Sequence, residues 1–275
     1  MDQDPKLMLV RQNFFKTSTL IILLMLIVFQ FIAFQYSFTT KIVPDGVSLL
    51  IMFACVFYLW MSERLDRERL LKMNLELILA QNEIKESQIN IIMSLALSQE
   101  AKDTYTQGHS RRVTKYAVEL AKILGLTNEE IAIIERAGKL HDIGKIGICD
   151  DILLSKEKLS SEQYSVIKGH PLKSASILDP LKFLDREKAI ILHHHERYDG
   201  TGYPDGLRGD QIPLGSRILA LVDAFDAMKS KRPYKKEQSK AEILEEIKNN
   251  AGSQFDPEVV RAFFSISEHF FVESS

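Results

Sequence analysis

The sequence predicts an all-α protein in which a helical domain follows two transmembrane helices and a long connector helix. Helix start signals recur through residues 101–275, and no segment of strand length alternates apolar and polar residues. Two apolar runs dominate residues 1–61, and residues 62–100 contain neither glycine nor proline. These observations divide the chain into a membrane anchor (1–61), a connector (62–100) and one domain (101–275).

The composition excludes two classes of protein. The 275 residues include 35 Lys and Arg against 37 Asp and Glu, which argues against binding of a nucleic-acid polymer through bulk electrostatics. Cys55 and Cys149 are the two cysteines, so no disulfide framework is expected. We interpret both as packing residues.

The membrane anchor is predicted from length and hydropathy. Residues 17–38 are nearly all apolar, and about 20 such residues cross a bilayer core. Residues 47–61 form a second apolar run near the short end for a span, within a transmembrane helix predicted over about 43–61; a buried soluble helix or a re-entrant segment is the alternative. Lys and Arg flank both runs, which places both chain ends in the cytoplasm and predicts a multi-pass protein of the inner membrane.

The connector carries a heptad-like apolar seam. Its members are Leu71, Leu75, Ile78, Ile89 and Ile92. Asn82 and Lys85 interrupt the seam, as polar residues that set register do in coiled coils. We expect a parallel homodimer through this helix; the alternative is a helix packed on its own domain.

Helices are expected throughout residues 101–275. Thr127 with Glu130 and Ser160 with Gln163 form capping boxes, the second opening a segment that reaches His170. Apolar spacing predicts further helices over 186–195, 216–228, 238–250 and 257–268. Helix packing should therefore hold this domain together.

A candidate metal site begins at His141-Asp142-Ile143-Gly144-Lys145, where an imidazole and a carboxylate are adjacent. The proposed ligands are His109, His141, Asp142, His170, His194, His195 and Asp223. Imidazole and carboxylate without thiolate favour iron or manganese, and zinc or nickel also fit. Asp142 can bridge two ions, a bridging hydroxide can attack phosphorus, and Lys145 can stabilise developing negative charge.

Two assignments within this set stay open at the level of sequence. Successive helix positions turn by about 100°, so His193, His194 and His195 cannot all face one point, and His193 is kept as a supporting residue. Asp223 and Asp226 lie about one turn apart. Both can be ligands, or one can pair with a basic residue such as Arg112.

Two further segments suit a nucleotide. Residues 196–206 contain three glycines and a proline, which indicate tight turns, and Tyr203 beside Gly202 can stack on a base or touch a phosphate. Arg232 and Lys235 belong to a basic run that can grip phosphate. Alone, the first segment would be an ordinary turn and the second a solvated surface.

Together these motifs resemble the HD-GYP family, a branch of the HD metal-dependent phosphohydrolases. The resemblance covers residues 101–265 and rests on several motifs in one order. They are Gly108-His109-Ser110, His141-Asp142-Ile143-Gly144-Lys145, Gly169-His170-Pro171, His194-His195-Glu196, Gly202-Tyr203-Pro204, Asp223-Ala224-Phe225-Asp226, Arg232-Pro233-Tyr234 and Phe255-Asp256-Pro257.

The resemblance implies an HD-type helical bundle and a phosphodiesterase that hydrolyses cyclic di-GMP to pGpG and then to GMP. It implies that the seven candidate ligands bind two divalent metal ions and that Lys145 contacts the scissile phosphate. Gly202 and Tyr203 would shape the nucleotide pocket, and Arg232 and Lys235 would hold phosphate or guanine. Some members bind a third metal through a glutamate one turn before the first histidine; Tyr105 stands there, so two metals are expected.

Two alternatives accompany this expectation. One is an HD hydrolase acting on another cyclic dinucleotide, and the other is a receptor that binds the nucleotide without cutting it. The complete ligand set weighs against the receptor. The sequence does not identify an input signal.

Overall fold

The computed structural model describes residues 24–25, 27–32, 34–35, 46–102, 108–155, 157, 159–230 and 238–272. Throughout these residues the elements are helices, and the sole extended pairing is an isolated bridge between Ala251 and Phe255. The all-α prediction is confirmed for this part of the chain.

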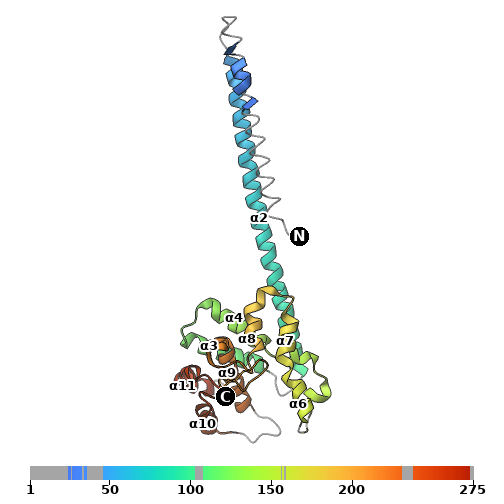
Figure 1. The fold of residues 1–275 in the computed structure, drawn as a ribbon, viewed down its shortest axis with the longest axis vertical. Helices are drawn as coiled ribbons and strands as arrows, with labels where there is room; N and C mark the ends of the chain where they lie inside the picture. The colour runs from blue at the N-terminus through green and yellow to red at the C-terminus, as the bar shows by residue number, and fades with distance from the viewer. Residues whose placement is uncertain are drawn as a thin grey trace. The chain divides into compact units, whose positions relative to one another are not determined.

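The chain divides into two compact units, Met1–Lys85 and Glu86–Ser275. Helix α2, Gly46–Lys102, contributes residues to both units. Figure 1 shows α2 as a single continuous helix.

The predicted membrane anchor is corrected by the structure. No helix among the described residues combines the length and the apolar character that crossing a membrane requires. In α2 the apolar stretch before the charged residues from Glu63 onward spans about 16 residues, or roughly 24 Å, against a bilayer core of about 30 Å. The prediction of two transmembrane helices was therefore wrong, as was the inner-membrane location inferred from it; most of residues 17–38 lies outside the described residues.

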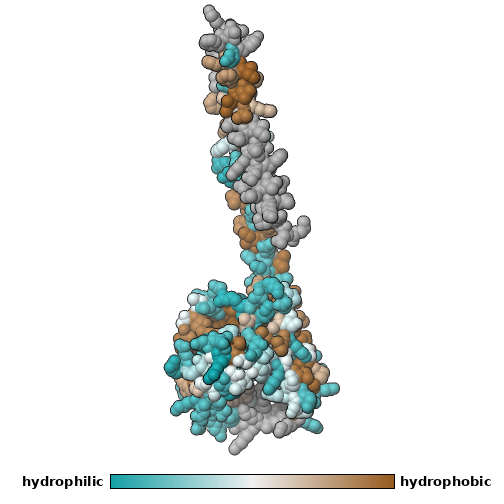
Figure 2. Space-filling model, viewed as in Figure 1, coloured by the Kyte–Doolittle hydropathy of each residue, from teal (hydrophilic) through white to brown (hydrophobic). Residues whose placement is uncertain are grey.

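The connector prediction has two outcomes along α2. In the first unit Leu71, Leu75 and Ile78 are exposed, and Figure 2 shows hydrophobic residues at the surface there. In the second unit Ile92 is buried in the hydrophobic core and Ile89 packs against it. The alternative, a helix packed on its own domain, thus holds for the end of α2, while the homodimer stays a prediction.

The second unit is a bundle of short helices. In chain order after α2 these are α3 (His109–Ile123), α4 (Asn128–Leu140), η1 (Ile143–Gly147), α5 (Asp150–Leu153), α6 (Ser161–Lys168), α7 (His170–Leu178), η2 (Lys182–Leu184), α8 (Asp185–Leu192), η3 (Gly209–Gln211), α9 (Leu214–Lys229), α10 (Lys240–Asn249) and α11 (Pro257–Val272). Figure 1 shows α3, α4, α8 and α9 gathered at its centre.

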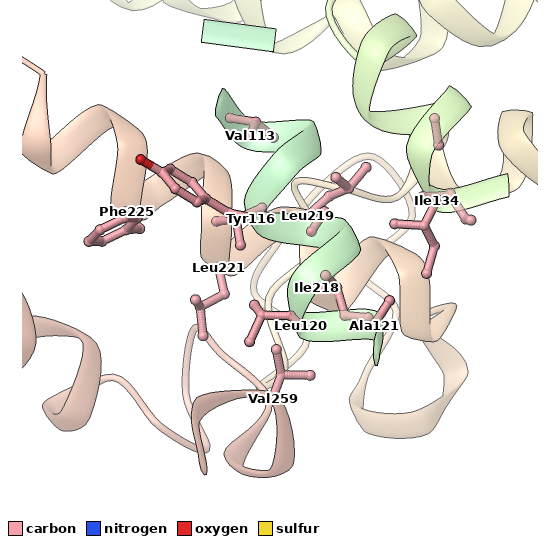
Figure 3. Packing of buried hydrophobic residues seen from close by; sticks show 14 of the residues in the cluster. Val113, Tyr116, Leu120, Ala121, Ile134, Ile218, Leu219, Leu221, Phe225 and Val259 are labelled. Carbon is pink, nitrogen blue, oxygen red and sulfur yellow. The ribbon is translucent and has the colours of Figure 1, made fainter. Parts of the chain in front are cut away.

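The core forms where α3 meets α9. Val113, Tyr116 and Leu120 lie on one face of α3, because residues three or four positions apart share a helix face. Figure 3 shows them packed toward Ile218 and Phe225 of α9, and the rings of Tyr116 and Phe225 meet edge to face at 5.3 Å. Burial of each such side chain stabilises the fold by about 1.5–3 kcal/mol. This packing fixes two helices that carry candidate metal ligands.

The ends of the other helices position the remaining candidate ligands. Both predicted capping boxes, at Thr127 and at Ser160, are present. The predicted helix over 186–195 ends at Leu192, so the three histidines after it lie in a turn rather than on a helix. The 100° spacing of helix positions therefore does not set the directions of these three side chains. His193 is instead held apart by its own contacts, with Nδ1 donating to the carbonyl of Ala189 at 2.8 Å and Nε2 lying 3.0 Å from Oδ2 of Asp205.

Candidate metal centre

Four junctions and one helix interior supply the seven candidate ligands. His109 is the first residue of α3, His141 and Asp142 follow α4, and His170 opens α7. His194 and His195 follow α8, and Asp223 lies within α9. Five histidines and two aspartates from remote parts of the sequence thereby meet in one place.

The candidate ligands form three groups whose ligand atoms lie within 4.8 Å of one another. The groups are His109 with His141 and Asp223, His170 with His194 and His195, and His141 with Asp142 and His194. Oδ1 of Asp142 lies 3.2 Å from Nε2 of His170, whereas Oδ2 lies 3.5 Å from Nε2 of His141. One carboxylate thus presents an oxygen to each of the first two groups.

Three of the histidines are oriented by the same device. His141, His170 and His194 each donate from Nδ1 to the carbonyl oxygen three residues earlier, at 2.8, 2.8 and 2.6 Å. These carbonyls belong to the last turns of α4, α6 and α8, where backbone acceptors have no partner within the helix. Since a carbonyl only accepts, the proton is on Nδ1 and the lone pair of Nε2 is available to a metal.

His109 is oriented by a carboxylate instead. Its Nδ1 lies 2.8 Å from Oδ2 of the buried Asp226, and its Nε2 lies 3.2 Å from Oδ1 of Asp223. Arg112 binds Asp226 with two hydrogen bonds, of 2.7 and 2.9 Å. The alternative left open by the sequence is decided: Asp226 pairs with Arg112 and supports His109, and Asp223 faces the ligand groups.

Burial keeps three imidazoles neutral. It lowers the pKa of His141, lowers that of His194 well below its usual value, and lowers that of His195 to about 4. Nε2 of His141 is buried without a hydrogen-bond partner among the described residues. Buried nitrogen atoms with free lone pairs are the donors that a divalent metal ion requires, so these residues fit such an ion.

The carboxylates remain ionised beside them. Burial would raise the pKa of Asp142, but Lys145, with Nζ at 2.5 Å from Oδ2, and His141 hold it well below its usual value. Burial likewise opposes ionisation of Asp223, yet the hydrogen bond from His109 keeps its pKa low. Burial would lower the pKa of His109, but Asp223 and Asp226 outweigh it and raise the pKa to about 10.

The glycine-rich loop after the histidines is tied to them. A Cβ on Gly202 would lie 2.2 Å from the backbone nitrogen of Arg197, so only glycine allows this return of the chain. The backbone nitrogen of Tyr203 donates to the carbonyl of His195 at 3.3 Å, and the two rings lie 5.0 Å apart at 30°. Tyr203 therefore covers the candidate ligand His195. Arg232, Lys235 and Tyr105 lie outside the described residues.

The HD-domain family model matches residues 92–259, a span that includes all seven candidate ligands. The chain belongs to the HD domain family. HD-domain phosphohydrolases depend on metal ions, and the described residues of this chain include three His and Asp groups able to hold one.

Curated relatives share this part of the chain. The cyclic di-GMP phosphodiesterase response regulator RpfG of Xanthomonas campestris pv. campestris is 40% identical over 198 residues, which are 71% of this chain and 52% of the relative. The 3'3'-cGAMP-specific phosphodiesterase 2 of Vibrio cholerae is 36% identical over 65% of this chain and 34% of its own length. The chain thus spans about half, or less, of the length of these relatives.

A solved structure supports the fold. The cyclic GMP-AMP-specific phosphodiesterase V-cGAP3 of V. cholerae matches with a TM-score of 0.52 and 20% identity, over 66% of this chain and 50% of its own. This likeness shows that the HD-type helical fold is shared.

Two residues of this HD domain, Glu196 and Ser174, support the site although the sequence alone assigned neither of them a role. Oε1 of the buried Glu196 accepts from the backbone nitrogens of Asp205 and Gly206, at 2.7 and 3.0 Å. In the same loop, Nε2 of His193 lies 3.0 Å from Oδ2 of Asp205. Oγ of Ser174 joins the carbonyl of His141 to the nitrogen of Gly144. Glu196 could have been found from the sequence, because its carboxylate comes directly after the histidines and before a glycine-rich turn. No feature of the neighbouring sequence distinguishes Ser174 from other serines.

Proposed function

We propose that this chain is a metal-dependent phosphodiesterase of the HD-GYP branch that hydrolyses cyclic di-GMP to pGpG and then to GMP. The observation that carries the proposal is the position of Asp142, whose two oxygens face two separate groups of ligand atoms. The cyclic di-GMP phosphodiesterase activity named for the 40% identical relative supports the choice of substrate.

Two divalent ions, iron or manganese by the chemistry of the donors, fit the site. His109, His141 and Asp223 would hold one, His170, His194 and His195 the other, and Asp142 would be shared. Such a pair supplies a water of lowered pKa and positive charge for the phosphate oxygens.

The surrounding residues supply orientation and charge. Lys145 holds Oδ2 of Asp142 and adds positive charge where the attacked phosphate becomes more negative. The half-buried ring of Tyr203 offers a face for a base beside His195. Gly202 and Tyr203 thereby shape the nucleotide pocket, with Arg232 and Lys235 as further contacts to phosphate or guanine.

A second candidate substrate is 3'3'-cGAMP, because a 36% identical relative is named for that activity. It differs from cyclic di-GMP in one purine, so the same centre can serve either. The residues that contact the purine bases, rather than the metal ligands, would then decide which of the two substrates is preferred.

Turnover by the full chain tests the proposal. The protein, loaded separately with Mn²⁺, Fe²⁺, Zn²⁺ and Ni²⁺, is incubated with cyclic di-GMP or 3'3'-cGAMP, and products are separated by chromatography. We expect pGpG and GMP from cyclic di-GMP, and loss of both metal and turnover in the double variant His141→Ala with Asp142→Ala at unchanged helical content. Absence of product with every metal would support a receptor, and faster cleavage of 3'3'-cGAMP would reassign the substrate.

A further inference from the structure

We propose that Tyr164 and Lys168 of α6 bind one purine base of the substrate, and that Lys168 selects guanine over adenine at this position. The inference rests on the proposed function and deepens it. It concerns two side chains of α6, a helix whose assigned part in the site is the carbonyl of Ile167 that accepts from His170.

The placement of Lys168 joins α6 to the metal centre. Its Nζ lies 5.3 Å from the ring centre of Tyr203 and 5.1 Å from that of Tyr164. The ring of Tyr203 in turn lies against that of His195 at 5.0 Å. Another candidate ligand, His170, begins α7 two residues after Lys168.

Packing does not explain these two side chains. Helix α6 contains no buried residue, and Tyr164 is 53% exposed. Lys168 is exposed as well, and no carboxylate within the described residues forms an ion pair with it. The exposed ring of Tyr164 and the ring of Tyr203 both contact the Lys168 ammonium group. This arrangement is better suited to binding a ligand than to packing in a hydrophobic core.

The chemistry of the pair distinguishes the purines. An aromatic ring stacks on any base, so Tyr164 contributes affinity without selectivity. Guanine presents two acceptors on one edge, N7 and O6, whereas adenine presents the N7 acceptor beside an N6 donor. An ammonium group only donates, so Lys168 satisfies both guanine atoms and opposes the adenine amino group.

The decisive experiment compares substrates in Lys168→Met, which keeps most of the apolar stem. The kcat/KM of the Mn²⁺-loaded full chain is measured on cyclic di-GMP, cyclic di-AMP and bis(p-nitrophenyl) phosphate, which has no base. We expect a loss of about 10-fold on cyclic di-GMP, little change on bis(p-nitrophenyl) phosphate, and a smaller loss on cyclic di-AMP. Lys122→Met, an exposed lysine in the last turn of α3, serves as the matched control and should change none of these values.

Variants of Tyr164 test the stacking half of the inference. Tyr164→Ala should lower kcat/KM for both dinucleotides equally, by about 10-fold, and Tyr164→Phe should retain the wild-type values. Unequal losses in Tyr164→Ala, or equal losses on both dinucleotides in Lys168→Met, would overturn the assignment. The second result would mean that Lys168 holds a phosphate.

Binding of mononucleotides separates this inference from the proposed function. Calorimetry measures the affinities of GMP and AMP for the wild type and for Lys168→Met. If the wild type cleaves no dinucleotide, the proposed function fails, but a preference for GMP that disappears in Lys168→Met still supports the guanine contact. Unchanged preference in the variant overturns the inference whether or not the wild type is active.

Discussion

Nδ1 of His109 donates a hydrogen bond to Oδ2 of Asp226 at 2.8 Å, although 117 positions separate the two residues. The buried carboxylate also receives two hydrogen bonds from Arg112, so its own position is fixed. Partners of this kind set the ring orientation of a metal-binding histidine and raise its basicity.

Replacing Asp226 by Asn should therefore weaken metal binding without removing a ligand. We expect a loss of about 10–100-fold in affinity for the metal held by His109, His141 and Asp223. Titration of the metal-free protein with Mn²⁺ measures it, and Asp151→Asn, at an exposed carboxylate in α5, is the control. Unchanged affinity in Asp226→Asn would assign Asp226 a purely structural role.

Metal binding should release a proton from His109. The carboxylates overcome the effect of burial and raise its pKa from 6.5 to about 10, so the ring is charged at neutral pH and contributes stability that is lost as the pH rises through 10. His195, with a pKa of about 4, is already neutral at pH 7.5 and therefore releases no proton when a metal binds. Calorimetry at pH 7.5 in buffers of different ionisation enthalpy should show release of about one proton, vanishing above pH 10.

Lys145 should affect rate rather than metal content. Its Nζ contacts Asp142 but is not among the ligand atoms, so Lys145→Ala should leave the bound metal in place. Loss of one charge contact in the transition state would cost about 3 kcal/mol, or roughly 100-fold in kcat. Metal analysis beside steady-state kinetics checks this, and a parallel loss of metal would show that Lys145 holds Asp142 in place.

Glu196 should control how the loop with Tyr203 is held. Glu196→Gln keeps an oxygen for the nitrogens of Asp205 and Gly206, whereas Glu196→Ala leaves both donors without it. We expect Glu196→Ala to raise KM about 10-fold or more with metal retained, and Glu196→Gln to stay within about threefold of wild type. Equal effects of the two variants would argue against the role of the accepting oxygen.

Gly144 should be essential for the junction between η1 and α7. A Cβ there would lie 2.2 Å from the carbonyl oxygen of His170 and 2.5 Å from the nitrogen of Ser174, both backbone atoms. Gly144→Ala should destabilise the fold by about 1–3 kcal/mol or more, measured by urea unfolding. Gly147→Ala is the matched control, because its Cβ would meet the flexible end of Lys173 at 3.3 Å.

Sequence reasoning succeeded where a property is local. Capping boxes at Thr127 and Ser160 depend on residues three positions apart, and the structure shows both. The membrane prediction failed although hydropathy is also local, because the apolar stretch of α2 gives way to charged residues before it reaches the length of a span.

The sequence by itself determined which residue types were available: five imidazoles and two carboxylates of a candidate metal site, with a lysine beside them. Only the tertiary structure decided that Asp142 faces two groups, that Asp226 supports His109 rather than joining Asp223, and that the end of α2 packs into the domain. The physical reason is that chemical identity belongs to each residue, whereas the distance between two side chains depends on how helices remote in the chain pack together.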